Sequence, residues 1–269
     1  MTLLIYLCIG AVTGILAGLF GVGGGTIIVP ALLISLAAQG VSPDVLTHMA
    51  LGTSLATICL TSISSVIAHN ERDAILWPVF FKLTPGICCG VLLGSIIAAR
   101  LSGLALQKGF GVFALVVSAQ MFCNWQPGGS SRLPGNFGLF AGGGVIGLFS
   151  ALFGIGGGSL TVPFLSFCRI TMQHAVATAA AIGMPIAFVG ALGYLWQGWN
   201  NPALPEWSSG YIYWPAFTGI AIASVAFARV GAHIAHSLSP KKLKQIFALF
   251  LALIGLWLLF DDMILSQIH

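Results

Sequence analysis

Long apolar segments separated by short polar breaks make up nearly the whole chain. The breaks fall at residues 39–43, 69–73, 101–107, 124–136, 169–173, 197–210 and 237–244. About eight apolar segments lie between them, and several exceed the roughly 18 to 20 residues that a helix needs to cross a bilayer. Because open backbone cannot face lipid, we expect every segment to be helical. The pattern therefore predicts an all-α integral membrane protein.

Two stretches of the chain carry the same glycine-rich pattern. Residues 14–30 (GILAGLFGVGGGTIIVP) match residues 147–163 (GLFSALFGIGGGSLTVP) without a gap. Downstream, and in the same order, Trp77-Pro78 matches Trp214-Pro215 and residues 94–102 match 231–239. Repetition of this kind predicts two tandem homologous repeats of about four helical segments each.

The repeats define the organisation of one membrane domain. We place the first transmembrane repeat at residues 1–125, a connecting loop at 126–136 and the second repeat at 137–269. Duplicated halves in a membrane protein are typical of transporters.

Each glycine motif interrupts its apolar segment. A single helix over the first segment, some 35 residues, would be about 50 Å long, which is too long for a hydrocarbon core of about 30 Å. We therefore predict that the first segment of each repeat is broken at a GGG turn, in a re-entrant or hairpin arrangement enclosed by protein. A hairpin makes the two repeats inverted, whereas a single crossing makes them parallel. Loop charges satisfy the positive-inside rule in both cases, and the segment length favours inversion.

The helix starts that follow the glycines are candidate anion sites. Helix N-termini carry unpaired N–H groups and a partial positive charge, and glycine lets a ligand approach the backbone closely. Close packing of helices through small residues is the alternative interpretation. The candidate substrate-binding residues at these starts are Gly23, Gly24, Gly25, Thr26, Gly156, Gly157, Gly158 and Ser159.

A second glycine position adds two hydroxyl candidates. Thr53 and Ser54 follow Gly52, which we interpret as a further break in its segment. The counterpart in the second repeat, at residues 183–185 (GMP), keeps the break without the hydroxyls. We therefore expect a substrate contribution from Thr53 and Ser54 on one side only.

Few charged groups lie within the apolar segments. An intramembrane arginine is costly unless it is paired or functional, so Arg229 is a candidate substrate contact, whereas Lys82 is expected to extend to the interface. All six acidic residues sit in breaks or at segment ends, which leaves His48 as the candidate for a proton-linked group.

Composition excludes several classes of protein. Of the 269 residues 58% are hydrophobic and 6% are charged, whereas a soluble domain carries about 25% charged residues. The net charge of +4 is spread over short loops, as in an oriented membrane protein rather than a nucleic-acid-binding one. The six cysteines form no CxxC pair. We expect no cofactor, no metal site, no catalytic residues and no nucleic-acid partner.

The paired element F-G-[Val/Ile]-G-G-G-[Thr/Ser]-x-x-V-P, present once in each repeat, resembles that of the TauE/SafE family of sulfite and organosulfonate exporters. The resemblance covers both repeats. It implies a multi-pass permease of the bacterial inner membrane that exports a small sulfur-containing anion through the paired glycine breaks. The expected partners are the anionic substrate and the lipid bilayer, with a homodimer left open. A passive anion channel is the near alternative, and an intramembrane enzyme or a metal-handling protein is the distant one.

Overall fold

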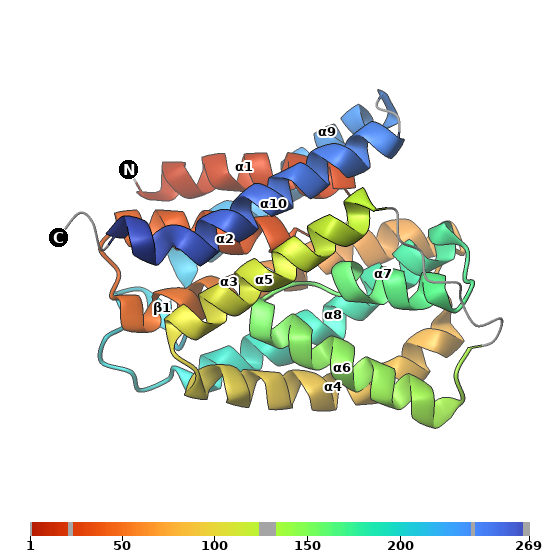
Figure 1. Ribbon diagram of the computed structural model, residues 1–269, viewed down its shortest axis with the longest axis horizontal. Helices are drawn as coiled ribbons and strands as arrows, with labels where there is room; N and C mark the ends of the chain where they lie inside the picture. Colours follow the sequence, from red (N-terminus) through yellow and green to blue (C-terminus); the bar gives the residue numbers. More distant parts are fainter. Residues whose placement is uncertain (1, 21–23, 124–132, 238–239, 266–269) are drawn as a thin grey trace.

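The computed structural model describes residues 2–20, 24–123, 133–237 and 240–265, which are almost entirely helical (Figure 1). The helices are α1 (Thr2–Phe20), α2 (Gly25–Ala38), α3 (Pro43–Asn70), α4 (Trp77–Arg100), α5 (Gly103–Phe122), α6 (Asn136–Phe153), α7 (Gly158–Phe167), α8 (Met172–Gln197), α9 (Trp214–Ser237) and α10 (Pro240–Leu265). A short antiparallel pair of strands, β1 (Ser208–Ser209) and β2 (Ile212–Tyr213), lies between α8 and α9.

Five of the described helices are long and apolar enough to cross a membrane. They are α4, α5, α6, α8 and the Pro43–Ile67 part of α3. In α3 and in α8, 56% of an 18-residue apolar stretch is buried inside the protein, compared with 28% of such a stretch in α5. The predicted all-α membrane class is confirmed, and α3 and α8 lie at the centre of the bundle.

Local sequence accounts for two helix starts. Ser42 precedes α3 and Pro43 occupies its first turn, where a missing N–H costs nothing, although the Ser42 hydroxyl makes no capping bond. The predicted break at 101–107 is shorter than expected because Ser102 caps α5, accepting a hydrogen bond from the Ala105 N–H at 3.2 Å.

The predicted breaks at Gly52 and Gly183 are wrong. Both α3 and α8 continue through these positions. A Cβ at Gly52 would lie 2.6 Å from the carbonyl oxygen of Tyr211, so this glycine makes room for the loop that precedes α9. Gly52 thus serves close packing rather than a turn.

Small residues bring the helices into close contact. α1 packs on α9 and α4 packs on α6. A Cβ at Gly10 would lie 2.8 Å from the Ile220 Cα, and one at Gly94 would lie 2.6 Å from the Leu148 carbonyl oxygen. Without a strong hydrophobic drive between helices in lipid, such backbone proximity is what dispersion and weak polar contacts require.

The most extensive helix contacts form corresponding pairs when five is added to the numbers of α1 to α5 and subtracted from those of α6 to α10. α1–α9 corresponds to α6–α4, α2–α3 to α7–α8, and α3–α9 to α8–α4, while the α3–α8 and α5–α10 pairs map onto themselves. In Figure 1, α3 runs from left to right and α8 from right to left.

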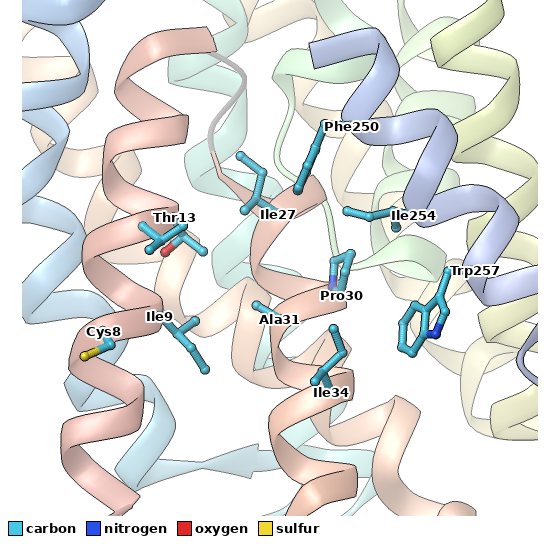
Figure 2. Close-up of a pocket in the computed structure, with 11 residues that line it drawn as sticks. Cys8, Ile9, Thr13, Ile27, Pro30, Ala31, Ile34, Phe250, Ile254 and Trp257 are labelled. Carbon is cyan, nitrogen blue, oxygen red and sulfur yellow. The ribbon is translucent and has the colours of Figure 1, made fainter. Parts of the chain in front are cut away.

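The chain reverses direction between α1 and α2. In Figure 2 the labelled residues of α1 rise from Cys8 to Thr13, whereas those of α2 descend from Ile27 to Ile34. The two helices are therefore antiparallel neighbours, and α2 returns toward the end of the bundle at which α1 begins.

Candidate functional site

Helix ends flank both glycine motifs. In the first motif α1 ends at Phe20, and Gly24 is the residue before α2 with a φ of 75°. The candidate Gly23 lies outside the described residues. In the second motif Gly154 ends α6 with a φ of 61°, and α7 begins at Gly158. Side chains are strained at such positive φ angles, so the backbone at Gly24 and Gly154 requires glycine.

The start of α2 contacts the second glycine motif directly. A Cβ placed on Gly25 would lie 2.8 Å from the Cα of Ile155 and 2.9 Å from the carbonyl oxygen of Gly154. The Ser54 hydroxyl of α3 donates to that same carbonyl oxygen at 2.8 Å. The two motifs, one from each half of the sequence, therefore meet beside α3.

The start of α7 rests on α8. A Cβ on Gly157 would lie 2.8 Å from the Ala179 carbonyl oxygen and 3.0 Å from the Gly183 nitrogen. A Cβ on Gly183 would in turn lie 3.8 Å from the Cβ of Ser62 on α3. The two central helices thus hold the two glycine segments between them.

The starts of α2 and α7 present backbone donors. The Gly24 carbonyl accepts from Ile27 and Ile28 at 2.9 Å, and the Gly157 carbonyl accepts from Thr161 at 2.9 Å, which are the first bonds of each helix. The N–H groups in the first turn of a helix have no intrahelical acceptor, and they carry the positive end of the helix dipole. Both helix starts are consequently suited to an anion.

Four buried hydroxyls around these helix starts have no hydrogen-bond partner among the described residues: Thr26, Ser150, Ser159 and Thr161. Thr26 is 2% exposed, and Ser150 and Thr161 are 0% exposed. Burying a hydroxyl without a partner is unfavourable, so such groups in the first turns of α2 and α7 and near the end of α6, next to unpaired backbone N–H groups, indicate a place for a polar ligand.

Sequence reasoning missed Ser150 and Thr161, although the repeats carried a signal for both. In the gapless match of the two motifs, the first copy has Ala17 where the second has Ser150, and Ile28 where the second has Thr161. Polar replacements of apolar residues in an otherwise matching copy would have singled them out.

The hydroxyls of Thr53 and Ser54 have protein partners. Thr53 accepts from the Tyr213 N–H at 3.0 Å, just before α9, and Ser54 donates to Gly154. Thr178 of α8 plays the matching part in the other half, accepting from the Leu76 N–H just before α4 at 3.0 Å. These hydroxyls therefore position the glycine segment and the helix starts around the site.

His48 lies away from the glycine motifs, nearly two helical turns, or about 9 Å, before Ser54 on α3. Its ring is 4% exposed and stacks on Tyr211 with 5.0 Å between centroids. Nε2 lies 3.0 Å from the Ala98 carbonyl oxygen and donates to it, and Nδ1 has no hydrogen-bond partner in the described part of the chain.

Of the two basic candidates, the structure describes the side chain of Lys82 but not that of Arg229. Lys82 is exposed on α4, as expected of a side chain that extends to the interface. Arg229 belongs to α9, but its side chain lies outside what the structure describes. Within the described ranges, no group of three or more His, Cys, Asp or Glu side chains could hold a metal ion.

Known proteins resemble the chain over nearly its full length. Residues 6–258 match the family model of the sulfite exporter TauE/SafE. A probable membrane transporter protein of Haemophilus influenzae is 36% identical over 257 residues, which cover 94% of this chain and 97% of that protein. One from Methanocaldococcus jannaschii is 30% identical over 256 residues, 93% of each chain. No solved structure matches. The chain therefore belongs to the TauE/SafE family, and it is a multi-pass membrane transporter rather than an enzyme.

Proposed function

We propose that this transporter exports a small sulfur-containing oxyanion, sulfite or a sulfonate, across the bacterial inner membrane. We place its binding site where α2 and α7 begin. The observation that carries the proposal is the contact between Gly25 and the Gly154–Ile155 segment, together with the buried hydroxyls without partners in the first turns of α2 and α7. The family's description as sulfite exporters supports the sulfur-containing substrate.

The charge of the site suits an anion with few charges. Each helix N-terminus carries roughly half a positive charge, so two of them together balance about one negative charge. None of the acidic side chains that the structure describes is buried. Recognition would then depend on backbone N–H groups and neutral hydroxyls, namely those of Gly24, Gly25, Thr26, Gly156, Gly157, Gly158 and Ser159 with Ser150 and Thr161 added.

We also propose that the two halves are inverted repeats, each opening with a hairpin broken at its GGG turn. The opposite directions of α3 and α8 in Figure 1 and the correspondence of helix pairs support this arrangement. Inversion would bring α2 and α7 to the middle of the membrane from opposite sides, so that each helix start faces the same ligand. A site shared by two inverted elements can open to either side in turn.

Replacing unpartnered hydroxyls by isosteric methyl groups tests the site. In Thr26→Val and Thr161→Val no hydrogen bond to the described protein is lost, so we expect thermal stability in detergent to stay the same or to rise. Sulfite efflux from proteoliposomes should fall about two- to tenfold, the equivalent of one hydrogen bond of about 0.5 to 1.5 kcal/mol. The matched control is Thr84→Val, whose hydroxyl donates to the Phe80 carbonyl of its own helix.

The two readouts separate the outcomes. Lower efflux with unchanged stability in the two site variants, and wild-type efflux in the control, supports the proposed site. Wild-type efflux in both site variants would mean that these hydroxyls do not face the substrate. Efflux that rises linearly with sulfite concentration, without saturation, would indicate a passive channel instead.

A further inference from the structure

An open apolar groove of about 390 Å³ separates α10 from the α1–α2 hairpin (Figure 2). Figure 2 shows Ile254 and Trp257 of α10 on one side, Ile9 of α1 on the other, and Ala31 of α2 between them. Its edges include Val12 and Ile34, which are 56% and 55% exposed, and Ile27 at 4% exposure lies deeper. The groove therefore opens on the outer surface of the helical bundle.

The groove offers few polar groups to a ligand. Its hydroxyl group, on Thr13, is 2% exposed and donates to the Gly10 carbonyl oxygen of its own helix at 3.2 Å. The remaining lining side chains are hydrocarbon apart from the Cys8 thiol and the Trp257 indole. An anion would lose its hydration here and gain at most a thiol and an indole N–H as donors, so this groove is distinct from the proposed transport site.

The position of the lining residues along their helices places the groove within the hydrocarbon core. Cys8 to Thr13 occupy the middle of α1, and Phe250 to Trp257 occupy the middle of α10. The solvent at this depth is lipid, and the molecules that can fill an apolar groove open to lipid are the acyl chains of the bilayer.

Comparison with the second half shows that the groove is not a general result of the fold. When the gapless match of the two glycine motifs is extended in both directions, Ala31 corresponds to Phe164 and Ile9 to Gly142. A Cβ on Gly142 would lie 3.0 Å from the ring of Phe164, so this ring covers the corresponding position of α6. In the first half a methyl group takes the place of that ring, and the space beside α2 stays open.

We propose that this groove binds one acyl chain of a bilayer phospholipid, which takes the place that the ring of Phe164 takes in the other half. The bound chain packs against Ile27, the residue after Thr26, and fills the gap between α2 and α10. The inference does not rest on the transported substrate, because it concerns the outer face of α2 alone.

The test replaces Ala31 of the first half by phenylalanine, the residue at the corresponding position of the second half. Ala31→Phe places a ring in the groove, and Ala37→Phe adds the same ring to an exposed position of α2 outside it. The readout is the fraction of molecules that keep one phospholipid in native mass spectrometry after purification in mild detergent. We expect this fraction to be unchanged in Ala37→Phe. In Ala31→Phe it should fall about tenfold, as expected if roughly two methylenes lose their buried contacts.

A second measurement keeps the proposal testable if Ala31→Phe fails to fold. Phospholipid brominated in the middle of its acyl chain should quench part of the wild-type tryptophan fluorescence, and Trp257→Phe should remove that part. Equal lipid retention in Ala31→Phe and wild type would overturn the proposal, as would the absence of quenching at Trp257. Dissociation of a dimer by Ala31→Phe would also overturn it, because the groove would then be an interface between two copies.

Discussion

Gly157→Ala is the substitution that most directly tests the packing of α7 on α8. Gly157 has a φ of −59°, which alanine adopts without strain, so the effect of the change comes from the added methyl group alone. That methyl group would lie 2.8 Å from the Ala179 carbonyl oxygen, 3.0 Å from the Gly183 nitrogen and 3.1 Å from the Ile182 side chain. Two of these three neighbours are backbone atoms of a continuous helix and cannot rotate away.

The expected cost follows from these distances. Ordinary contact begins at 3.4 Å, so α7 and α8 must separate locally by about 0.6 Å from the 2.8 Å position. Overpacking of this kind costs about 1 to 3 kcal/mol. If the whole cost falls on the bound state, affinity for the anion drops about five- to 150-fold. A displaced α7 start also moves the Gly158 and Ser159 N–H groups relative to α2.

The assay is sulfite efflux from proteoliposomes, combined with thermal unfolding in detergent. The matched control is Gly144→Ala on α6, where the nearest atom would be the Gly86 carbonyl oxygen at an ordinary 3.7 Å. We expect Gly157→Ala to slow efflux and to raise the half-saturating concentration of sulfite, while Gly144→Ala resembles the wild type. Wild-type efflux and stability in Gly157→Ala would refute the close packing of α7 on α8 and, with it, the placement of the site.

Three further predictions concern buried hydroxyls and the driving force. Ser54→Ala leaves the buried Gly154 carbonyl without its 2.8 Å partner and should lower the free energy of unfolding by about 1 to 3 kcal/mol, measured by thermal unfolding; an unchanged melting temperature would contradict the role of Ser54. Thr53→Val and Thr178→Val each leave one backbone N–H unpaired, so we expect similar losses that add in the double variant, and a deviation above about 0.5 kcal/mol would show that the two positions are coupled. Export of one negative charge gains about 2.3 kcal/mol per 100 mV, so efflux should respond to a potassium–valinomycin potential without a proton or sodium gradient. His48→Gln should change at most the pH dependence of efflux, and efflux that ignores voltage and follows a proton gradient would refute this mechanism.

The helical membrane class could be predicted because lipid restricts the choices of the backbone. An apolar segment of the chain must satisfy its own N–H and C=O groups, so hydropathy and length suffice to identify the helices. The start of α3 was also predictable, since Pro43 is compatible with the first turn and with few other helical positions.

The tertiary partners of single residues could not be predicted in the same way. Gly52 and Gly183 look like breaks in the sequence, but a glycine inside a helix can equally accommodate a neighbouring backbone, and only the approach of Tyr211 decides which role Gly52 has. Thr53 and Ser54 were expected to face a ligand, whereas their hydroxyls bond to a loop N–H and to the Gly154 carbonyl. Both partners belong to the other half of the sequence, and the local pattern around a hydroxyl contains no information about them.

The crossed packing of α1 on α9 and of α4 on α6 bears on which parts of the molecule can move. Each of these close contacts joins one half of the sequence to the other, and their glycines hold the backbones too near for sliding or separation at low cost. Rocking of residues 1–125 against 137–269 would have to break both contacts at once. We therefore expect two rigid bodies in the transport cycle, α1 with α9 and α4 with α6, each assembled from both halves of the sequence. The boundary between the moving parts would then differ from the boundary between the two repeats.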